Sequence, residues 1–190
     1  DKRQLVKKIN LNSLYGALLN PGSRFNDPRM GQSTTLTGRT IARHMGAKVN
    51  ELFTGKYDHV GESIIYGDTD SVYFSAYPVF KDQIESGEFA WDKDKVTELY
   101  ETVCEQANET FPDYMATAHN VQNKEQGKII AAAREVSATA GIYITKKRYA
   151  ILVYDNEGHR EDYDDKPGKI KAMGLDLKRS DTPAFMQDFL

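Results

Sequence analysis

The chain is organised around the stretch Ser63-Ile64-Ile65-Tyr66-Gly67-Asp68-Thr69-Asp70-Ser71-Val72-Tyr73-Phe74-Ser75. Its apolar and aromatic residues favour two short strands, over residues 64–66 and 71–75, and Gly67 and Asp68 favour a tight turn between them. Asp68 and Asp70 are two positions apart, so on an extended backbone both carboxylates would project from one face. The stretch therefore predicts an antiparallel hairpin that displays two acids.

Two carboxylates this close repel each other unless a cation or a proton lies between them. Magnesium fits, because it takes oxygen ligands and is commonly held by one or two carboxylates together with substrate phosphates. The bare Asp-x-Asp pattern also occurs in solvated turns, which is the simpler alternative. The apolar strands on both sides favour the metal site, since they would fix the pair on a rigid element.

Length and composition indicate a soluble globular chain. The 190 residues suffice for one domain with a core, and 39% hydrophobic and 28% charged residues are ordinary values. No apolar run approaches the length of a membrane span. The single cysteine, Cys104, excludes a disulfide framework and favours a reducing compartment. The first residues show no initiator Met and no apolar signal region, and we expect both ends to have been cut from a longer protein.

Charge is segregated along the chain. Residues 1–50 hold nine Lys and Arg against two Asp and Glu, whereas residues 51–135 hold seven against seventeen. Residues 136–190 hold nine of each, with a basic run at Lys146-Lys147-Arg148. A net charge of −3 argues against nucleic-acid binding, but this distribution would let a polyanion dock on the two ends of the chain. Solvated charged faces produce the same pattern, so the alternative stays open.

A helix is predicted over residues 3–19, before the stop signal Asn20-Pro21-Gly22. Lys8, Asn12 and Tyr15 fall in one narrow stripe of this helix. A cation, an amide and a phenol in line suit a flat anionic ligand, and Gly16 would let it approach the backbone closely. An exposed face with an incidental Tyr explains the stripe equally well.

The remaining pattern mixes helices and strands, which predicts an α+β fold with an antiparallel sheet covered on one face by helices. Asp27-Pro28 is typical of a helix start. The expected elements are a helix over 29–53, an acidic loop over 77–94, a helix over 96–111, a strand over 129–137 carrying Glu135, a strand over 141–154, a turn at 155–158, a short return strand, and a final helix starting at Thr182-Pro183.

Three motifs resemble those of family B DNA polymerases. Residues 8–16, Lys-Ile-Asn-Leu-Asn-Ser-Leu-Tyr-Gly, resemble the family's Lys-x-x-x-Asn-Ser-x-Tyr-Gly motif. Residues 66–71, Tyr-Gly-Asp-Thr-Asp-Ser, are similar to its palm hairpin motif, and residues 146–149, Lys-Lys-Arg-Tyr, to its primer-contacting Lys-Lys-x-Tyr motif. Residues 171–175 are also similar to the palm-to-thumb junction of T-even-type phage polymerases. The three motifs occur in the family's order.

The resemblance implies template-directed DNA synthesis, in which dNTPs are added to a primer 3′-hydroxyl with two Mg²⁺ ions, for which Mn²⁺ may substitute. It implies an incomplete domain: residues 1–20 would be the last fingers helix, 21–174 a palm without its upstream motif, and 175–190 the start of the thumb. The implied partners are primer–template DNA, dNTP and a sliding clamp bound elsewhere in a larger protein, with no membrane. The implied location is the cytoplasm of an infected bacterial host.

The resemblance also implies roles for individual residues. Asp68 and Asp70 correspond to catalytic metal ligands, Asp70 being the better candidate for bridging both ions. Glu135 resembles an acid near the metals; some relatives carry a second acid where this chain has Ala133. The implied substrate contacts come from two motifs: nucleotide from Lys8, Asn12 and Tyr15, and DNA from Gly16, Lys146, Lys147, Arg148 and Tyr149.

Three other classes of protein could carry a hairpin with two aspartates. A calcium-binding EF-hand loop needs a third oxygen ligand where Val72 stands, so it does not fit. An RNA-copying palm enzyme would more typically carry adjacent aspartates in the hairpin. A non-catalytic nucleic-acid-binding domain on the same scaffold is the remaining alternative.

Overall fold

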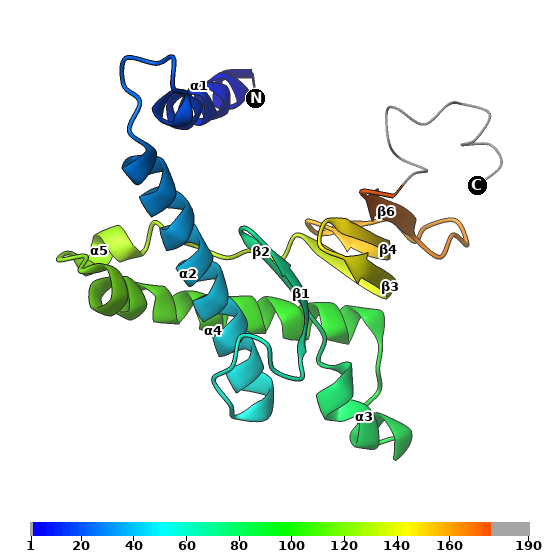
Figure 1. The fold of residues 1–190 in the computed structure, drawn as a ribbon. Coiled ribbons are helices and arrows are strands. Elements are labelled where there is room, and N and C mark those ends of the chain that lie inside the picture. Colours follow the sequence, from blue (N-terminus) through cyan, green and yellow to red (C-terminus); the bar gives the residue numbers. More distant parts are fainter. Residues whose placement is uncertain (1, 176–190) are drawn as a thin grey trace, which may run out of the picture.

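The computed structural model describes residues 2–175, and the predicted α+β class is confirmed (Figure 1). The helices are α1 (Lys2–Leu19), α2 (Pro28–Thr54), α3 (Tyr77–Glu85), α4 (Lys93–His119) and α5 (Lys124–Gly127). The strands are β1 (Ile64–Asp68), β2 (Ser71–Phe74), β3 (Val136–Thr145), β4 (Arg148–Asn156), β5 (His159–Arg160) and β6 (Lys169–Met173). The helix predicted from Thr182, and the segment 176–190 as a whole, lie outside the described residues.

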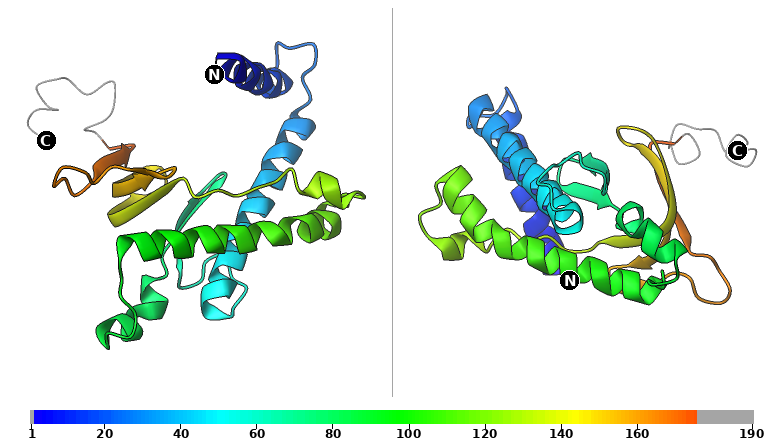
Figure 2. Two further views of the ribbon diagram at one scale, coloured as in Figure 1. Left: turned by 180° about the vertical axis from the view of Figure 1, so that it is seen from behind. Right: turned by 90° about the horizontal axis from the view of Figure 1, so that it is seen from below.

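The strands of the described part form two antiparallel sheets. β1 and β2 make the predicted hairpin, and β4 is the central strand of a second sheet that pairs with β3, β5 and β6. Figures 1 and 2 show α4 running along the same side of both sheets, with α2 crossing it beside the hairpin. Helices therefore cover one face, as predicted, but the single expected sheet is divided in two.

The core lies where these layers meet. α2 contributes Ala47 and Val49, and α4 contributes an apolar stripe at helical spacing. From Tyr149 to Val153, β4 buries every second residue, which is the period of a strand with one covered face, and Tyr154 and Asp155 are buried as well. The buried apolar residues of α4 and β4 are Val96, Val103, Ala107, Phe111, Met115, Tyr149, Ile151, Val153 and Tyr154.

The start of α2 follows the predicted signal, and its end is closed by a glycine. The Asp27 carboxylate accepts a hydrogen bond from the Arg29 amide, Pro28 occupies the first turn, and Gly55 closes the helix in the left-handed region at φ 73°.

Four predictions of secondary structure are wrong. Residues 77–85 form α3 rather than an acidic loop, and α4 continues through Pro112 to His119, where Asn120 ends it in the left-handed region at φ 53°. Residues 130–135 form no strand, so Glu135 lies in the link before β3. The predicted strand over 141–154 is two strands, because the chain reverses at Lys146 and Lys147, the latter with φ 62°.

His44 is buried where α2 crosses α4. Its ring stacks on Tyr114 with 3.8 Å between ring centroids. Thr110 Oγ1 donates to the Ala107 carbonyl, so it accepts from His44 Nε2 at 3.0 Å, which leaves Nδ1 to accept from Tyr57 Oη at 2.7 Å. Burial lowers the pKa of His44, which favours the neutral ring.

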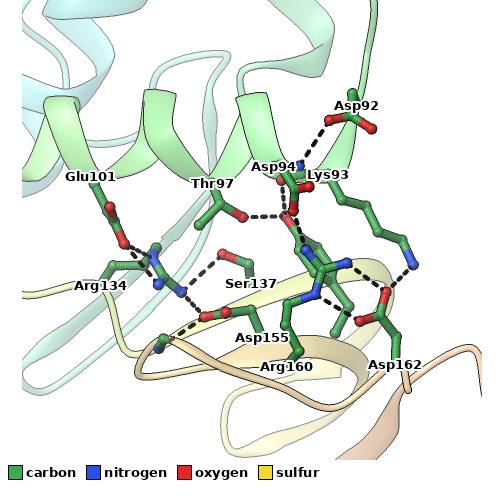
Figure 3. A network of polar contacts seen from close by, with 12 residues as sticks. Asp92, Lys93, Asp94, Thr97, Glu101, Arg134, Ser137, Asp155, Arg160 and Asp162 are labelled. Carbon is green, nitrogen blue, oxygen red and sulfur yellow. Dashed lines mark hydrogen bonds and ion pairs between the residues drawn. The ribbon is translucent and has the colours of Figure 1, made fainter. Parts of the chain in front are cut away.

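Two ionic networks attach α4 to the second sheet (Figure 3). In one, Arg134 pairs with Asp155 of β4 and with Glu101 of α4. In the other, Arg160 of β5 pairs with Asp162 and with Asp94 of α4. Because Arg134 precedes β3, the first network also fixes the end of the link that carries Glu135.

Candidate active site

The two predicted carboxylates lie at the turn of the β1–β2 hairpin. Asp68 is the last residue of β1 and pairs with Ser71 of β2, so Thr69 and Asp70 form a two-residue turn, with Thr69 at φ 40°. The expected extended backbone through both acids is therefore wrong: a turn follows Asp68, and Asp70 belongs to that turn. The Thr69 hydroxyl donates to Asp68 Oδ1 at 3.2 Å, which restrains the first carboxylate.

A buried amide fixes the base of the hairpin. Asn50 of α2 is 2% exposed, and its Oδ1 accepts from both the amide and the hydroxyl of Ser63, at 3.2 and 2.8 Å. Its Nδ2 donates to Thr54 Oγ1 and to the Lys56 carbonyl. All the polar groups of Asn50 are thus satisfied, and β1 leaves α2 in a defined direction.

Four tyrosines join the hairpin to the second sheet. The rings of Tyr66, Tyr73, Tyr143 and Tyr149 are 5.4–5.7 Å apart in every pairing, and Tyr73 Oη and Tyr149 Oη are 2.8 Å apart. Burial raises the pKa of Tyr143 to about 12 and raises the pKa of Tyr73 further, so both phenols stay protonated. This tyrosine cluster links the two sheets through ring contacts and one hydroxyl pair.

The basic motif at residues 146–149 lies at the β3–β4 turn and reaches the hairpin. The Lys147 amide donates to Tyr66 Oη at 2.8 Å, and Lys147 Nζ is 3.3 Å from Asp68 Oδ2. Lys146 and Arg148 are exposed, and Arg148 Nε donates to the Gly174 carbonyl. Tyr149 is only 3% exposed, so in this structure it supports the turn and is not accessible to DNA, contrary to the expected contact.

Glu135 lies in the link just before β3. Its carbonyl accepts from the Glu157 amide at 2.7 Å, and its carboxylate is 2.6 Å from Lys171 Nζ of β6. Glu135 and Asp70 line one cavity of about 420 Å³ between the hairpin, α4 and the start of β3. Two of the predicted acids therefore face a shared space.

Carboxylate oxygens are the donors that Mg²⁺ prefers, and two of them together with substrate phosphates form a common magnesium site. Within residues 2–175, no three acidic, His or Cys side chains are close enough together to hold a metal ion. The described residues therefore supply no complete metal site of their own, and a metal held by Asp68 and Asp70 together with substrate or water stays a prediction.

The structure does not bring the predicted nucleotide contacts to the carboxylates. Lys8, Asn12 and Gly16 are exposed on α1, and Tyr15 is half-buried. α1 packs against α2 and lies beyond the turn end of the hairpin (Figures 1 and 2). Among the described residues, no hydrogen bond or ion pair joins Lys8, Asn12 or Tyr15 to the hairpin. Their roles stay predictions.

Comparison with known proteins decides the family. A sequence profile of DNA polymerase family B matches residues 1–101. The chain belongs to DNA polymerase family B. The matched region contains two of the three family B motifs, at residues 8–16 and 66–71.

Individual family B relatives align over nearly the whole chain. The DNA-directed DNA polymerases of Escherichia phage RB69 and Enterobacteria phage T4 are each 32% identical to it, over 98% of this chain and 21% of the relative. The DNA polymerase of Pyramimonas orientalis virus is 28% identical over 95% of this chain and 12% of the relative. The chain thus spans about a fifth of the length of the two phage relatives.

Three parts of this family B site were not predicted from the sequence: the buried Asn50, the tyrosine cluster, and Lys171 beside Glu135. One signal in the sequence could have indicated that the two sheets share a packed aromatic layer. Each strand-like run carries a tyrosine, at Tyr66, Tyr73, Tyr143 and Tyr149. Residues 2–175 contain no helix that combines the length and apolar character needed to span a membrane.

Proposed function

We propose that this chain carries the nucleotidyl-transfer site of a larger DNA-directed DNA polymerase, which adds dNTPs to a primer 3′-hydroxyl on a DNA template. One observation carries the proposal. Lys147 lies 81 positions beyond Tyr66. Its amide donates a hydrogen bond to the Tyr66 hydroxyl, and its ammonium group lies beside Asp68. The hairpin motif and the basic motif, distant in sequence, therefore lie beside each other, which supports a shared role.

In this proposal Asp68 and Asp70 hold two Mg²⁺ ions, for which Mn²⁺ can substitute, and Glu135 is an accessory acid at the same cavity. When bound, the ions would activate the primer hydroxyl and stabilise the leaving pyrophosphate. Asp68 is oriented by Thr69, and Asp70 is held at the turn by the β1–β2 pairing. The hairpin thus provides a rigid support for both carboxylates.

The remaining roles concern substrate. Lys8 and Asn12 would contact the triphosphate, where the fixed charge of Lys8 offsets charge that builds on the transferring phosphate. Tyr15 and Gly16 would line the nascent base pair. The exposed ammonium and guanidinium groups of Lys146, Lys147 and Arg148 would contact the primer backbone, which contributes affinity but little sequence information. We assign Tyr149 to positioning this turn, because its ring is buried.

We further propose that residues 1–20 are the last fingers helix, 21–174 most of a palm and 175–190 the start of a thumb. The larger polymerase would bind a sliding clamp through other parts and would act in the cytoplasm of an infected bacterial host. The similarity to two phage polymerases supports this setting.

The test is primer extension by the full-length protein with Asp70→Asn. Extension should fall by several orders of magnitude while primer–template binding stays nearly unchanged, because the carboxylate acts through the metal. Asp82→Asn, an exposed aspartate on α3, is the matched control and should extend normally. Asp70→Asn activity within tenfold of wild type would contradict the assignment. A wild-type protein that binds primer–template but never extends it, with Mg²⁺ or Mn²⁺, would be the non-catalytic binding domain instead.

A further inference from the structure

Two of the three predicted metal-site carboxylates each carry a lysine partner from another element. Lys147 Nζ lies 3.3 Å from Asp68 Oδ2, and the side chain of Asp68 is 15% exposed. Lys171 Nζ lies 2.6 Å from Glu135 Oε1, and the side chain of Lys171 is 37% exposed. Both ammonium groups therefore lie where a metal cation would neutralise the same acids.

The backbone around Lys147 is held firmly, although its side chain is exposed. Its amide is bonded to Tyr66 Oη, and Gly174 passes so close that a Cβ there would lie 2.1 Å from the Lys147 carbonyl oxygen. The turn is thus clamped between the tyrosine cluster and the end of β6. Only the side chain of Lys147 is free to change partner.

Lys171 is placed by strand pairing. It lies opposite Ile151 in the β4–β6 register, and Ile151 belongs to the buried face of β4. Glu135 is held by its own backbone bond to Glu157 and by the neighbouring Arg134 network. The two side chains meet from separate fixed backbones.

An ammonium group neutralises a carboxylate as a metal does, but with half the charge of a divalent ion and no fixed coordination geometry. A divalent cation that binds Asp68 or Glu135 therefore competes with the lysine and releases it. A released lysine is available to a DNA phosphate. Any such exchange couples metal binding to DNA binding, and the coupling is reciprocal.

We propose that Lys147 and Lys171 are internal counter-ions of the carboxylate site, which metal displaces toward the DNA backbone, so that metal and primer–template bind with positive cooperativity. The proposal rests on the proposed function and adds Lys171 to its site. In the absence of metal the lysines pair with Asp68 and Glu135 and orient both carboxylates. When metal is bound, the two released lysines contact DNA phosphates and raise the affinity for DNA.

The experiment measures binding without turnover in the full-length protein. Mn²⁺ affinity is measured by electron paramagnetic resonance, and affinity for a primer–template with a dideoxy end is measured by fluorescence anisotropy with and without Mn²⁺. The variants are Lys147→Met and Lys171→Met. The matched controls are Lys146→Met, in the same turn, and Lys169→Met, two residues away in β6; neither lysine forms an ion pair with any residue among 2–175.

In the wild type, Mn²⁺ should raise primer–template affinity at least about fivefold. In Lys147→Met and in Lys171→Met, this Mn²⁺-induced gain in primer–template affinity should be smaller. Without DNA, each variant should bind Mn²⁺ up to about fivefold more tightly, since a competing positive charge is gone. Lys146→Met should weaken DNA binding but keep the wild-type factor, and Lys169→Met should keep the wild-type factor and Mn²⁺ affinity. Lys147→Arg keeps an ion-pairing cation and should behave as wild type, which separates loss of charge from misfolding.

The inference is overturned if both Met variants keep the wild-type factor, or if their Mn²⁺ affinity is unchanged or weaker. These outcomes are read only in a protein that extends primers. A wild type that neither extends nor binds primer–template overturns the proposed function itself, so the two failures are distinguishable.

Discussion

Arg134→Met removes the central cation of the network that fixes the link before β3. The Arg134 side chain is 8% exposed and pairs with Asp155, whose side chain is 6% exposed. It also donates to Glu101 Oε1 at 2.9 Å and to Ser137 Oγ at 3.4 Å (Figure 3). Burial opposes the charge on Arg134, but the hydrogen bonds to Asp155 and Glu101 outweigh it and raise its pKa, so Arg134 is charged at neutral pH.

Methionine fills a similar volume but leaves Asp155 as a buried carboxylate whose remaining hydrogen bond is from the Gly158 amide, at 3.1 Å. Breaking a buried pair in this way costs about 3–5 kcal/mol. The exposed half of the network, toward Glu101, adds no more than about 1 kcal/mol, because Glu101 is 54% exposed. We therefore expect local opening of β3 and β4 to become easier by about 3–5 kcal/mol.

Hydrogen exchange of the full-length protein measures this opening directly, by mass spectrometry on peptides from β3 and β4. The exchange of their amides should accelerate by about a hundredfold or more. Lys124→Met, which breaks an ion pair whose side chains are 68% and 73% exposed, is the control and should change exchange by no more than about fivefold. Adding Asp155→Asn should restore part of the protection, since no buried charge is then left unpaired. An Arg134→Met effect no larger than that of the control would refute the reasoning.

Three further predictions concern other elements. Lys8→Ala should raise KM for dNTP and lower kcat with primer affinity unchanged, as steady-state kinetics and DNA binding will show; collapse of DNA binding with normal nucleotide kinetics would contradict it. Because the pKa of His44 is lowered in the folded protein, the unfolded chain binds more protons at acidic pH. Stability should therefore be lost as pH falls below the ordinary His value of 6.5. Melting temperatures measured from pH 8 to 5 should depend less on pH in His44→Gln than in the wild type. Gly174→Ala should weaken primer binding and lower the melting temperature, because its φ of 63° and the nearby Lys147 carbonyl leave no room for a Cβ; Gly158→Ala, with open space around it, should leave primer binding unchanged.

Local chemistry made part of the fold predictable. The caps of α2 follow from Asp27, Pro28 and Gly55, and the β1–β2 hairpin follows from its strand-forming runs. These elements are set by residues that are neighbours in sequence. The same holds for the choice of Asp68 and Asp70 as candidate ligands.

Elements set by distant contacts were not predictable. The chain reverses at Lys146 and Lys147 without a Gly or Pro to mark the turn. Distant residues hold the left-handed Lys147 instead: Tyr66 of the hairpin accepts its amide, and Gly174 packs against its carbonyl. The extension of α4 past Pro112 depends on burial of Phe111 and Met115. Residues 130–135 were expected to continue a strand but bond instead to α4, where Asn108 donates to the Ala132 carbonyl.

The tyrosine cluster explains why two motifs so far apart in sequence must be kept together. A phenylalanine at position 66 could fill the same space, but the Lys147 amide would lose its acceptor at 2.8 Å. The Lys147 turn is exposed, so losing this hydrogen bond costs about 0.5–1.5 kcal/mol, the net contribution of an ordinary hydrogen bond. Tyr66 therefore does more than pack. Its hydroxyl fixes the backbone from which Lys147 reaches Asp68, so the position of the basic motif depends on the strand that carries the acids.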